Sequence, residues 1–202
     1  MRLLREADSA PVPWKNGGGL TREILREPPE EGVFDWRLSV ATIDAAGPFS
    51  SFDGYDRTLV LIRGTGLELT FAGHGGSRLT SPGELVAFDG SWSTQCALLG
   101  RPSSDLNLMV ARERMICETR CMALESVERV LTAGWSETLV CCVSGAITLT
   151  NGAGGELALG VVDTARCSAA DGELVCRNLG TRPARLFVAR LRRRDPQGFG
   201  PA

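Results

Sequence analysis

The chain has 202 residues, of which 43% are hydrophobic, and its formal net charge is −2 at pH 7. This length suits one large all-β domain or two small ones, and the charge balance excludes a general electrostatic surface for nucleic acid or an anionic membrane. The single histidine, His74, excludes metal sites built from several imidazoles. The sequence also lacks the glycine motifs of nucleotide-binding folds. We therefore expect neither a metal ion nor a cofactor.

The basic residues are unevenly divided between the two types. Of the 22 lysines and arginines, Lys15 is the only lysine. GC-rich coding explains an excess of arginine, and on a solvated surface the two cations are nearly interchangeable. In a tight site they differ, because lysine is a compact point charge whose pKa can move. Lys15 is therefore a candidate functional residue, and a solvated surface lysine is the alternative.

Seven cysteines indicate reduced thiols and not a disulfide framework. Their number is odd, Cys141 and Cys142 are adjacent, and the first residues lack the apolar segment of a signal peptide. No apolar run approaches the roughly 18 residues that a membrane span needs. These features predict a cytoplasmic protein with no membrane partner.

In chain order, the first distinctive segment is PWKNGGGLTREI at 13–24, which predicts a glycine turn followed by a strand. Three consecutive glycines favour positive φ or a close approach of backbones, and their amides can form an anion-binding nest beside Lys15. The alternative is a flexible hairpin turn with a solvated lysine.

The next segment, 34–43, alternates in the manner of a strand. Trp36 and Val40 share its apolar face, whereas Arg37 and Ser39 lie on the opposite face. In a closed barrel that second face points either to the lumen or to solvent. An arginine in the lumen needs a carboxylate from the protein or from a ligand.

Two further polar strings follow. Asp56 and Arg57 are adjacent in a strand, so their side chains must point to opposite faces. Farther along, Asp105, Asn107 and Met109 share one face of another strand, a pattern that a half-solvated strand would also show.

The other apolar runs predict short strands separated by glycine and proline turns, and only 124–131 is a candidate for a short helix. The runs span 58–64, 66–71, 84–88, 106–112, 138–145, 146–150, 173–179 and 184–191. Many short strands of this kind are typical of a sandwich or barrel.

The chain repeats itself. Residues 58–70 align without a gap with 138–150 at an offset of 80, and 108–112 align with 186–190. One supersecondary unit therefore occurs twice. This repeat predicts an all-β fold of two tandem antiparallel β-barrels or jelly rolls.

The two predicted barrels differ in their polar residues. We place the first at residues 1–112 and the second at 113–202. The first holds Lys15, Tyr55 and His74, the single members of their residue types. We therefore expect a ligand pocket in the first barrel and a structural role for the second.

Four strings taken together resemble the HutD/Ves family: PWKNGGGLTREI, FDWRLSVATI, GPFSSFDGYDRTLVLIRGTGLEL and SSDLNLMVAR. The resemblance covers the first 112 residues, and the second half matches mainly in strand layout. It implies a bicupin fold and a small cytosolic bacterial protein associated with histidine utilisation. It also implies a pocket in the first barrel for a small carboxylate. Carried over by residue, that pocket would use Lys15, Asn16, Arg22, Arg37, Arg57 and Asn107.

The leading interpretation is a metal-free bicupin that binds a small carboxylate and regulates histidine utilisation by sensing an intermediate such as N-formylglutamate or urocanate. One alternative is a metal-independent enzyme in which Lys15 acts on a small carbonyl or carboxylate substrate, with Glu23 or Asp56 as the acid. The other is a protein-interaction scaffold, whose edge strands or arginine-rich segment 190–195 hold a partner or a second copy in a homodimer. The expected partner is a small anionic ligand and not a nucleic acid.

Overall fold

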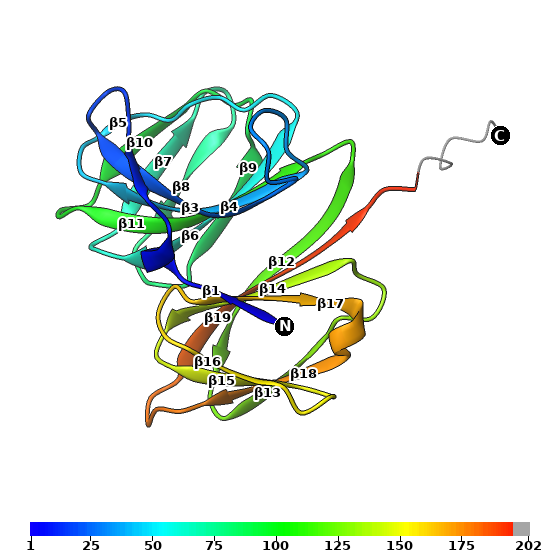
Figure 1. Ribbon diagram of the computed structural model, residues 1–202. Helices are drawn as coiled ribbons and strands as arrows, with labels where there is room; N and C mark the ends of the chain where they lie inside the picture. The colour runs from blue at the N-terminus through cyan, green and yellow to red at the C-terminus, as the bar shows by residue number, and fades with distance from the viewer. Residues whose placement is uncertain (196–202) are drawn as a thin grey trace.

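The computed structural model describes residues 1–195, and almost all of its regular structure is β-strand. The strands form two stacked barrels, each made of one larger and one smaller antiparallel sheet (Figure 1). The predicted all-β fold class is confirmed. The span expected for the second barrel, 113–202, includes residues 196–202, which lie outside the described residues.

The first barrel contains the sheets with strand orders β2-β3-β4-β11-β6-β9 and β5-β10-β7-β8. The strands of the larger sheet are Pro11–Pro13 (β2), Gly19–Glu27 (β3), Trp36–Ile43 (β4), Ser103–Ala111 (β11), Tyr55–Arg63 (β6) and Leu85–Asp89 (β9). Those of the smaller sheet are Gly47–Pro48 (β5), Thr94–Leu98 (β10), Leu67–Phe71 (β7) and Gly75–Leu79 (β8).

The second barrel contains the sheets β1-β17-β14-β19-β12 and β13-β18-β15-β16. The strands of the larger sheet are Arg2–Leu4 (β1), Thr164–Ser168 (β17), Glu137–Ser144 (β14), Ala184–Arg193 (β19) and Met115–Leu124 (β12). Those of the smaller sheet are Val127–Leu131 (β13), Glu173–Asn178 (β18), Ile147–Asn151 (β15) and Glu156–Leu159 (β16). The N-terminal strand β1 thus completes the second barrel, across the division expected at residues 112 and 113.

The repeated sequence forms a repeated topology. The order β4-β11-β6-β9 in one larger sheet corresponds to β12-β19-β14-β17 in the other. Both contain an irregularity, where Asp105 pairs with Leu61 and where Leu186 pairs with Cys142. By this structural match, Leu61 corresponds to Cys142, whereas the gapless sequence alignment equates Leu61 with Cys141. The sequence alignment is therefore off by one residue in β6 and β14, because the turn from β6 to β7 is one residue longer than the turn from β14 to β15.

The main apolar core lies between the barrels. Trp36, Leu38 and Val40 belong to one buried cluster together with Leu139 and Phe187 of the second barrel. Each larger sheet has one face toward the lumen of its own barrel and one face away from it. The two larger sheets therefore pack against each other through the faces that point away from the lumens. This arrangement leaves the opposite faces of β4, β6 and β11 to line the lumen of the first barrel.

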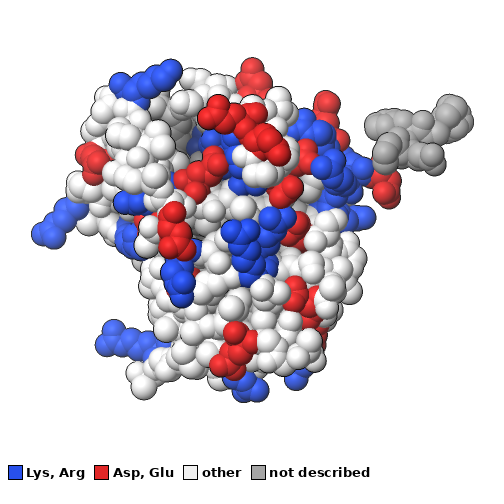
Figure 2. All heavy atoms as spheres, viewed as in Figure 1, with Lys and Arg blue, Asp and Glu red and all other residues white. Residues whose placement is uncertain are grey.

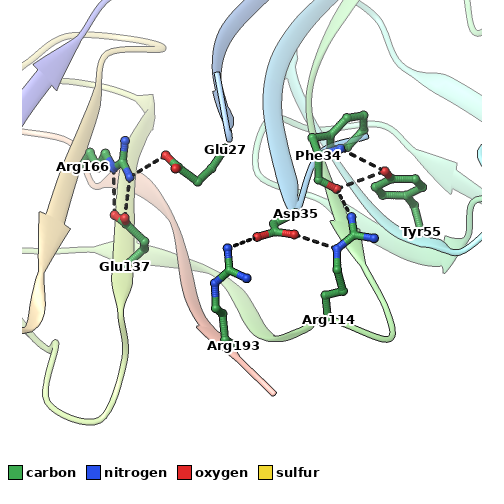
Figure 3. Close-up of polar contacts among 8 residues, drawn as sticks. All are labelled: Glu27, Phe34, Asp35, Tyr55, Arg114, Glu137, Arg166 and Arg193. Atoms are coloured by element: carbon green, nitrogen blue, oxygen red, sulfur yellow. Dashed lines mark hydrogen bonds and ion pairs between the residues drawn. The ribbon is translucent and has the colours of Figure 1, made fainter. Parts of the chain in front are cut away.

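Polar contacts at the edge of this core also join the barrels (Figure 3). Arg166 of β17 donates to Glu27 of β3 at 3.0 Å and to Glu137 of β14 at 2.8 Å. On the other side, Asp35 accepts from Arg114 at 2.7 Å and from Arg193 at 2.5 Å. Since Glu27 and Asp35 belong to the first barrel, these contacts bridge the two halves.

Helical structure within residues 1–195 is confined to two 3-10 turns, Glu6–Asp8 (η1) and Ala169–Asp171 (η2). None of the described helices is long and apolar enough to cross a membrane. The helix expected at 124–131 is wrong: these residues end β12 and form β13. Pairing of β13 with β18 and burial of Val130 outweigh the weak local helix propensity.

Candidate functional site

The first barrel contains a cavity of about 730 Å³ in its lumen, called here the lumen cavity. Five of the six predicted site residues line it: Lys15, Asn16, Arg37, Arg57 and Asn107. In the space-filling view, the upper half of the molecule is hollowed, and basic atoms are visible inside the hollow (Figure 2).

Three neighbouring strands position the polar side chains of this cavity. Met109 of β11 is paired with Arg37 of β4 on one side and with Arg57 of β6 on the other. Two residues along, Asn107 is paired with Ser39. Because alternate residues of a strand share a face, the same side of β4 and β11 supplies these groups. The face of Arg37, which the sequence left open, is therefore the lumen face.

Arg57 is buried among aromatic rings. Its Cζ lies 5.5, 5.6 and 5.0 Å from the ring centroids of Phe49, Phe52 and Phe88. One terminal nitrogen donates to the carbonyl of Ser50 at 3.3 Å, whereas the buried Nε has no partner. Burial lowers the pKa of Arg57 to about 10. The positive end of this side chain is therefore surrounded by ring faces, and a bound anion can add to their attraction for it.

Arg37 has a similar environment nearer the surface. Its Cζ lies 5.1 Å from the ring centroid of Phe34 and 5.2 Å from that of Phe52. Its closest carboxylate contact among the described ion pairs is Glu23, at 4.0 Å. The Nε is buried without a partner, and burial lowers the pKa of Arg37. Phe52 thus contacts both guanidinium groups.

Asp105 and Asn107 are the buried acceptors of the lumen cavity. The two residues are 1% and 7% exposed, and the Oδ1 atom of each has no hydrogen-bond partner. Burial raises the pKa of Asp105 to about 7, and the charge of Arg57 opposes that rise. The cavity therefore holds unsatisfied groups of both signs.

The turn before β3 and the loop after β5 form two sides of the cavity. Trp14 and Phe49 meet edge to face with ring centroids 5.9 Å apart, and the Trp14 Nε1 donates to Thr21 Oγ1 at 2.8 Å. Lys15 and Asn16 lie in the same turn and are exposed. Lys15 therefore contributes at the rim of the cavity rather than at its buried arginines.

The glycines of this turn allow backbone conformations and contacts that a side chain would prevent. Gly17 has a φ of 71°, and a Cβ on Gly19 would lie 2.2 Å from the carbonyl oxygen of Thr42. The amide of Gly17 donates to Trp14 O, and that of Gly18 donates to Asn16 Oδ1. The predicted anion nest is wrong at these two amides, because partners within the turn already use them.

Arg22 is the predicted site residue that the structure does not bring to the lumen cavity. One of its terminal nitrogens donates to the carbonyl of Ser9 at 2.5 Å. Arg22 follows Thr21, which lines the cavity, and adjacent residues of a strand point to opposite faces. It holds the N-terminal segment against β3.

Sequence reasoning did not assign Asp105, Ser39 or Phe52 to the site, although all three line the cavity. The signal for Asp105 was present, since it shares a strand face with Asn107. Phe52 lies in a loop, and no periodicity of the sequence indicates which way its ring points.

The second barrel has apolar residues at the equivalent positions. Aligned at the irregularity, Asp105 corresponds to Leu186 and Asn107 to Val188, so the alignment of 108–112 with 186–190 is wrong by three residues. Leu186 and Val188 belong to the buried core of the second barrel. This barrel is filled where the first one is open and polar.

The cavity does not fit a divalent cation. Asp105 is the only carboxylate among its lining residues, and it stands beside two guanidinium groups. Within residues 1–195, no group of three or more His, Cys, Asp or Glu side chains is placed to hold a metal ion. The lining residues instead complement an organic anion.

Sequence comparison identifies relatives of the chain. An uncharacterized 21.2 kDa protein from the hutC 3′ region of Pseudomonas putida is 43% identical over 116 residues, which cover 56% of this chain and 60% of that protein. Protein Ves from Cronobacter sakazakii is 35% identical over 123 residues, which cover 60% of this chain and 64% of that protein. The chain thus matches less than two thirds of the length of either relative.

Solved structures extend the similarity over nearly the whole chain. HutD from Pseudomonas fluorescens is 30% identical, with a TM-score of 0.80 and coverage of 96% of this chain and 99% of that one. A conserved protein of unknown function from Pseudomonas aeruginosa is 28% identical, with a TM-score of 0.84 and coverage of 94% and 97%.

A cupin 2 conserved barrel domain protein from Leptotrichia buccalis shares the fold, with a TM-score of 0.58 at 9% identity over 90% of this chain and 92% of that one. The predicted cupin-like fold is therefore confirmed. The HutD family matches residues 6–183. With most of its length matched in this way, the chain belongs to the HutD family.

Proposed function

We propose that the protein binds a small organic anion in the lumen cavity, with Arg37 and Arg57 holding its carboxylate group. The observation that carries this proposal is the pair of guanidinium groups in one cavity, each with a buried Nε that has no partner. A carboxylate complements such groups, because it accepts two parallel hydrogen bonds from one guanidinium. Each charge-assisted hydrogen bond contributes about 1.5–3 kcal/mol.

The electrostatics of the site favour the same ligand. Within residues 1–195, Arg57 takes part in no ion pair, and Arg37 approaches Glu23 only at 4.0 Å. Burial is the main cause that lowers the pKa of Arg57, the charge of Asp105 opposes it, and the charge of Arg37 adds to the lowering. A bound anion relieves this repulsion in a place where water cannot screen it well.

We extend the proposal to histidine utilisation. The Pseudomonas putida relative is named for the hutC 3′ region, and the Pseudomonas fluorescens relative is named HutD. On this basis the anion is an intermediate of histidine breakdown, such as N-formylglutamate or urocanate, and its binding regulates flux through the pathway. All seven cysteines are free, which supports action in the reducing cytoplasm.

Thermal unfolding in the presence of N-formylglutamate, urocanate and their methyl esters tests the proposal. The acids are expected to raise the Tm, because a ligand that binds only the folded state stabilises it. The fully esterified compounds, the dimethyl ester of N-formylglutamate and the methyl ester of urocanate, are close to the acids in shape but carry no carboxylate, so they are expected to leave the Tm unchanged. In Arg37→Ala the rise is lost while the unliganded protein still unfolds cooperatively.

Two outcomes oppose this function. One is the absence of any Tm shift at millimolar concentrations of either acid. The other is an equal shift by acid and ester, which would assign the effect to apolar contacts with the aromatic rings.

A further inference from the structure

Asp105 is the single carboxylate among the lining residues of the lumen cavity, which also include the buried Arg57 and the partly buried Arg37. It is 1% exposed, and its Oδ1 has no hydrogen-bond partner. Asn107, two residues along the same face, also has an unpartnered Oδ1. Buried acceptors are normally paired, because leaving one without a donor costs free energy. Both residues line the lumen cavity, which a ligand can enter.

Asp105 is not paired with the nearest arginine. Arg57 acts on it through its charge, yet no ion pair joins the two among residues 1–195, and Arg57 donates to Ser50 instead. Along β11, Asp105 lies four residues from Met109, the register partner of both arginines. At about 3.3 Å per residue, this separation is about 13 Å between Cα atoms.

The lumen cavity is therefore polarised along β11. Arg37 and Arg57 provide donors at the level of Met109, and Asn107 and Asp105 provide acceptors two and four residues along β11. All four residues line one cavity, and the charge of Arg57 acts on Asp105.

On the basis of the proposed function, we infer that the ligand is a carboxylic acid that also carries an N–H donor. Its carboxylate contacts Arg37 and Arg57, and its N–H donates to Asp105, with Asn107 beside it. This narrows the ligand class to acids with an amide or a heteroaromatic N–H. The oxygen analogues of such acids are expected to bind more weakly, because they leave Asp105 unpaired.

The number of protons released or taken up on binding shows whether Asp105 accepts a hydrogen bond from the ligand or donates one to it. Arg57 of β6 acts on Asp105 through its charge, and Asp105 in turn acts on the neutral thiol of Cys96 on β10, whose pKa burial raises to about 12. Arg37 of β4 and Lys15 at the rim are the other titratable groups that line the same cavity. The pKa of Asp105 is about 7 in the unliganded cavity. A donor ligand favours the carboxylate and releases a proton near neutral pH, whereas an acceptor ligand takes one up.

A matched pair of acids provides the test. The probes are 3-(pyrrol-2-yl)acrylate and 3-(furan-2-yl)acrylate, which share shape and charge but differ in N–H against ring oxygen. Calorimetric titration at pH 7 in two buffers of different ionisation enthalpy gives affinity and proton exchange together. We expect the pyrrole acid to bind at least about tenfold more tightly and with net proton release.

Two variants assign the preference to Asp105. Asp105→Leu introduces the residue type that the second barrel has at the equivalent position, Leu186, and is expected to bind both acids equally. Asp105→Asn keeps an acceptor without a titrating proton. It is expected to retain part of the preference for the pyrrole acid and to lose the proton release.

Equal affinity of the wild-type protein for the two acids overturns this inference, while the proposed anion site stands. Proton uptake with tighter binding of the furan acid also overturns it, because Asp105 would then be the donor. If neither these acids nor N-formylglutamate and urocanate bind, the proposed function fails, and the inference fails with it.

Discussion

Arg37 and Arg57 lie at the same level of the first barrel, because both are register partners of Met109 on opposite sides of β11. Their Cζ atoms lie 5.2 and 5.6 Å from the ring centroid of Phe52. Two cations gathered on one ring repel each other, and burial limits the screening of that repulsion by water. This repulsion costs free energy in the empty barrel, and a bound anion of the kind we propose would relieve it.

The first prediction concerns Arg57→Met. This substitution keeps an unbranched apolar side chain about as long as the arginine stem but removes the guanidinium group, with its donors, its charge and its contacts with the aromatic rings. We expect carboxylate affinity to fall by about 10- to 100-fold, the equivalent of one or two charge-assisted hydrogen bonds. The unfolding free energy of the empty protein is expected to stay within about 1 kcal/mol of the wild-type value, because a poorly paired buried charge is removed. Calorimetry and urea denaturation measure the two quantities.

Arg101→Met is the matched control, because Arg101 is an exposed arginine in the loop before β11. It makes the same chemical change outside the cavity and is expected to leave carboxylate affinity unchanged. If both variants lose affinity equally, the effect belongs to the net charge of the protein and not to the lumen cavity.

The second prediction concerns Lys15, which is exposed at the rim of the cavity. Lys15→Met is expected to reduce carboxylate affinity by no more than about fivefold, because two charges in contact with water attract each other by only about 1 kcal/mol. The reduction is expected to vanish at about 1 M salt, where the Debye length is about 3 Å. Titrations at low and high salt measure both effects.

Lys15→Arg retains the charge and is expected to bind carboxylates like the wild-type protein. A catalytic Lys15 that forms a Schiff base predicts the opposite, because arginine cannot replace the lysine amine as a nucleophile. Loss of function in Lys15→Arg, together with reductive trapping of a carbonyl compound on Lys15, would favour the alternative of an enzyme over that of a binding protein.

Much of the fold follows from periodicity and repetition in the sequence. Alternation along 34–43 separates the apolar side of Trp36 from the polar side of Arg37, and the structure keeps that separation. Alternation does not show what covers each face. The apolar face packs against the other barrel, and the polar face lines the lumen, because a second copy of the sheet supplies the apolar partner.

The site was harder to predict from the sequence than the fold. Arg22 and Arg37 both looked like cations of a polar strand, yet Arg22 points away from the lumen and binds Ser9. Arg22 is the register partner of Val40, which belongs to the apolar core between the barrels, and this register is not visible in the sequence alone. Phe52 reaches both arginines from a loop, where side-chain direction depends on tertiary packing.

The third prediction is a pH dependence of stability. Burial raises the pKa of Asp105 from its usual value near 4 to about 7. The folded protein therefore binds this proton more tightly than the unfolded chain does. The contribution of Asp105 to the unfolding free energy therefore falls by up to about 4 kcal/mol as pH rises from about 4 to about 7. Above that range it stays low.

Asp105→Asn removes this titration, so its unfolding free energy relative to the wild-type protein is expected to rise between pH 5 and pH 8. Urea denaturation of both proteins at several pH values, without ligand, measures the difference. A difference that does not change with pH would show that Asp105 stays in one protonation state over this range.

The fourth prediction concerns the polar bridge between the barrels, in which Arg166 contacts Glu27 and Glu137 (Figure 3). Arg166→Met removes both contacts, and its partly exposed ion pairs are expected to contribute about 1–2 kcal/mol to the unfolding free energy. Arg129→Met removes an exposed ion pair with Glu173 that lies wholly within the second barrel, and it is expected to cost less than about 0.5 kcal/mol.

Because Trp36 and Phe187 share one core, both variants are expected to unfold in a single transition. Two separate transitions in Arg166→Met, observed by fluorescence and circular dichroism, would show that the polar bridge and not the shared core couples the barrels.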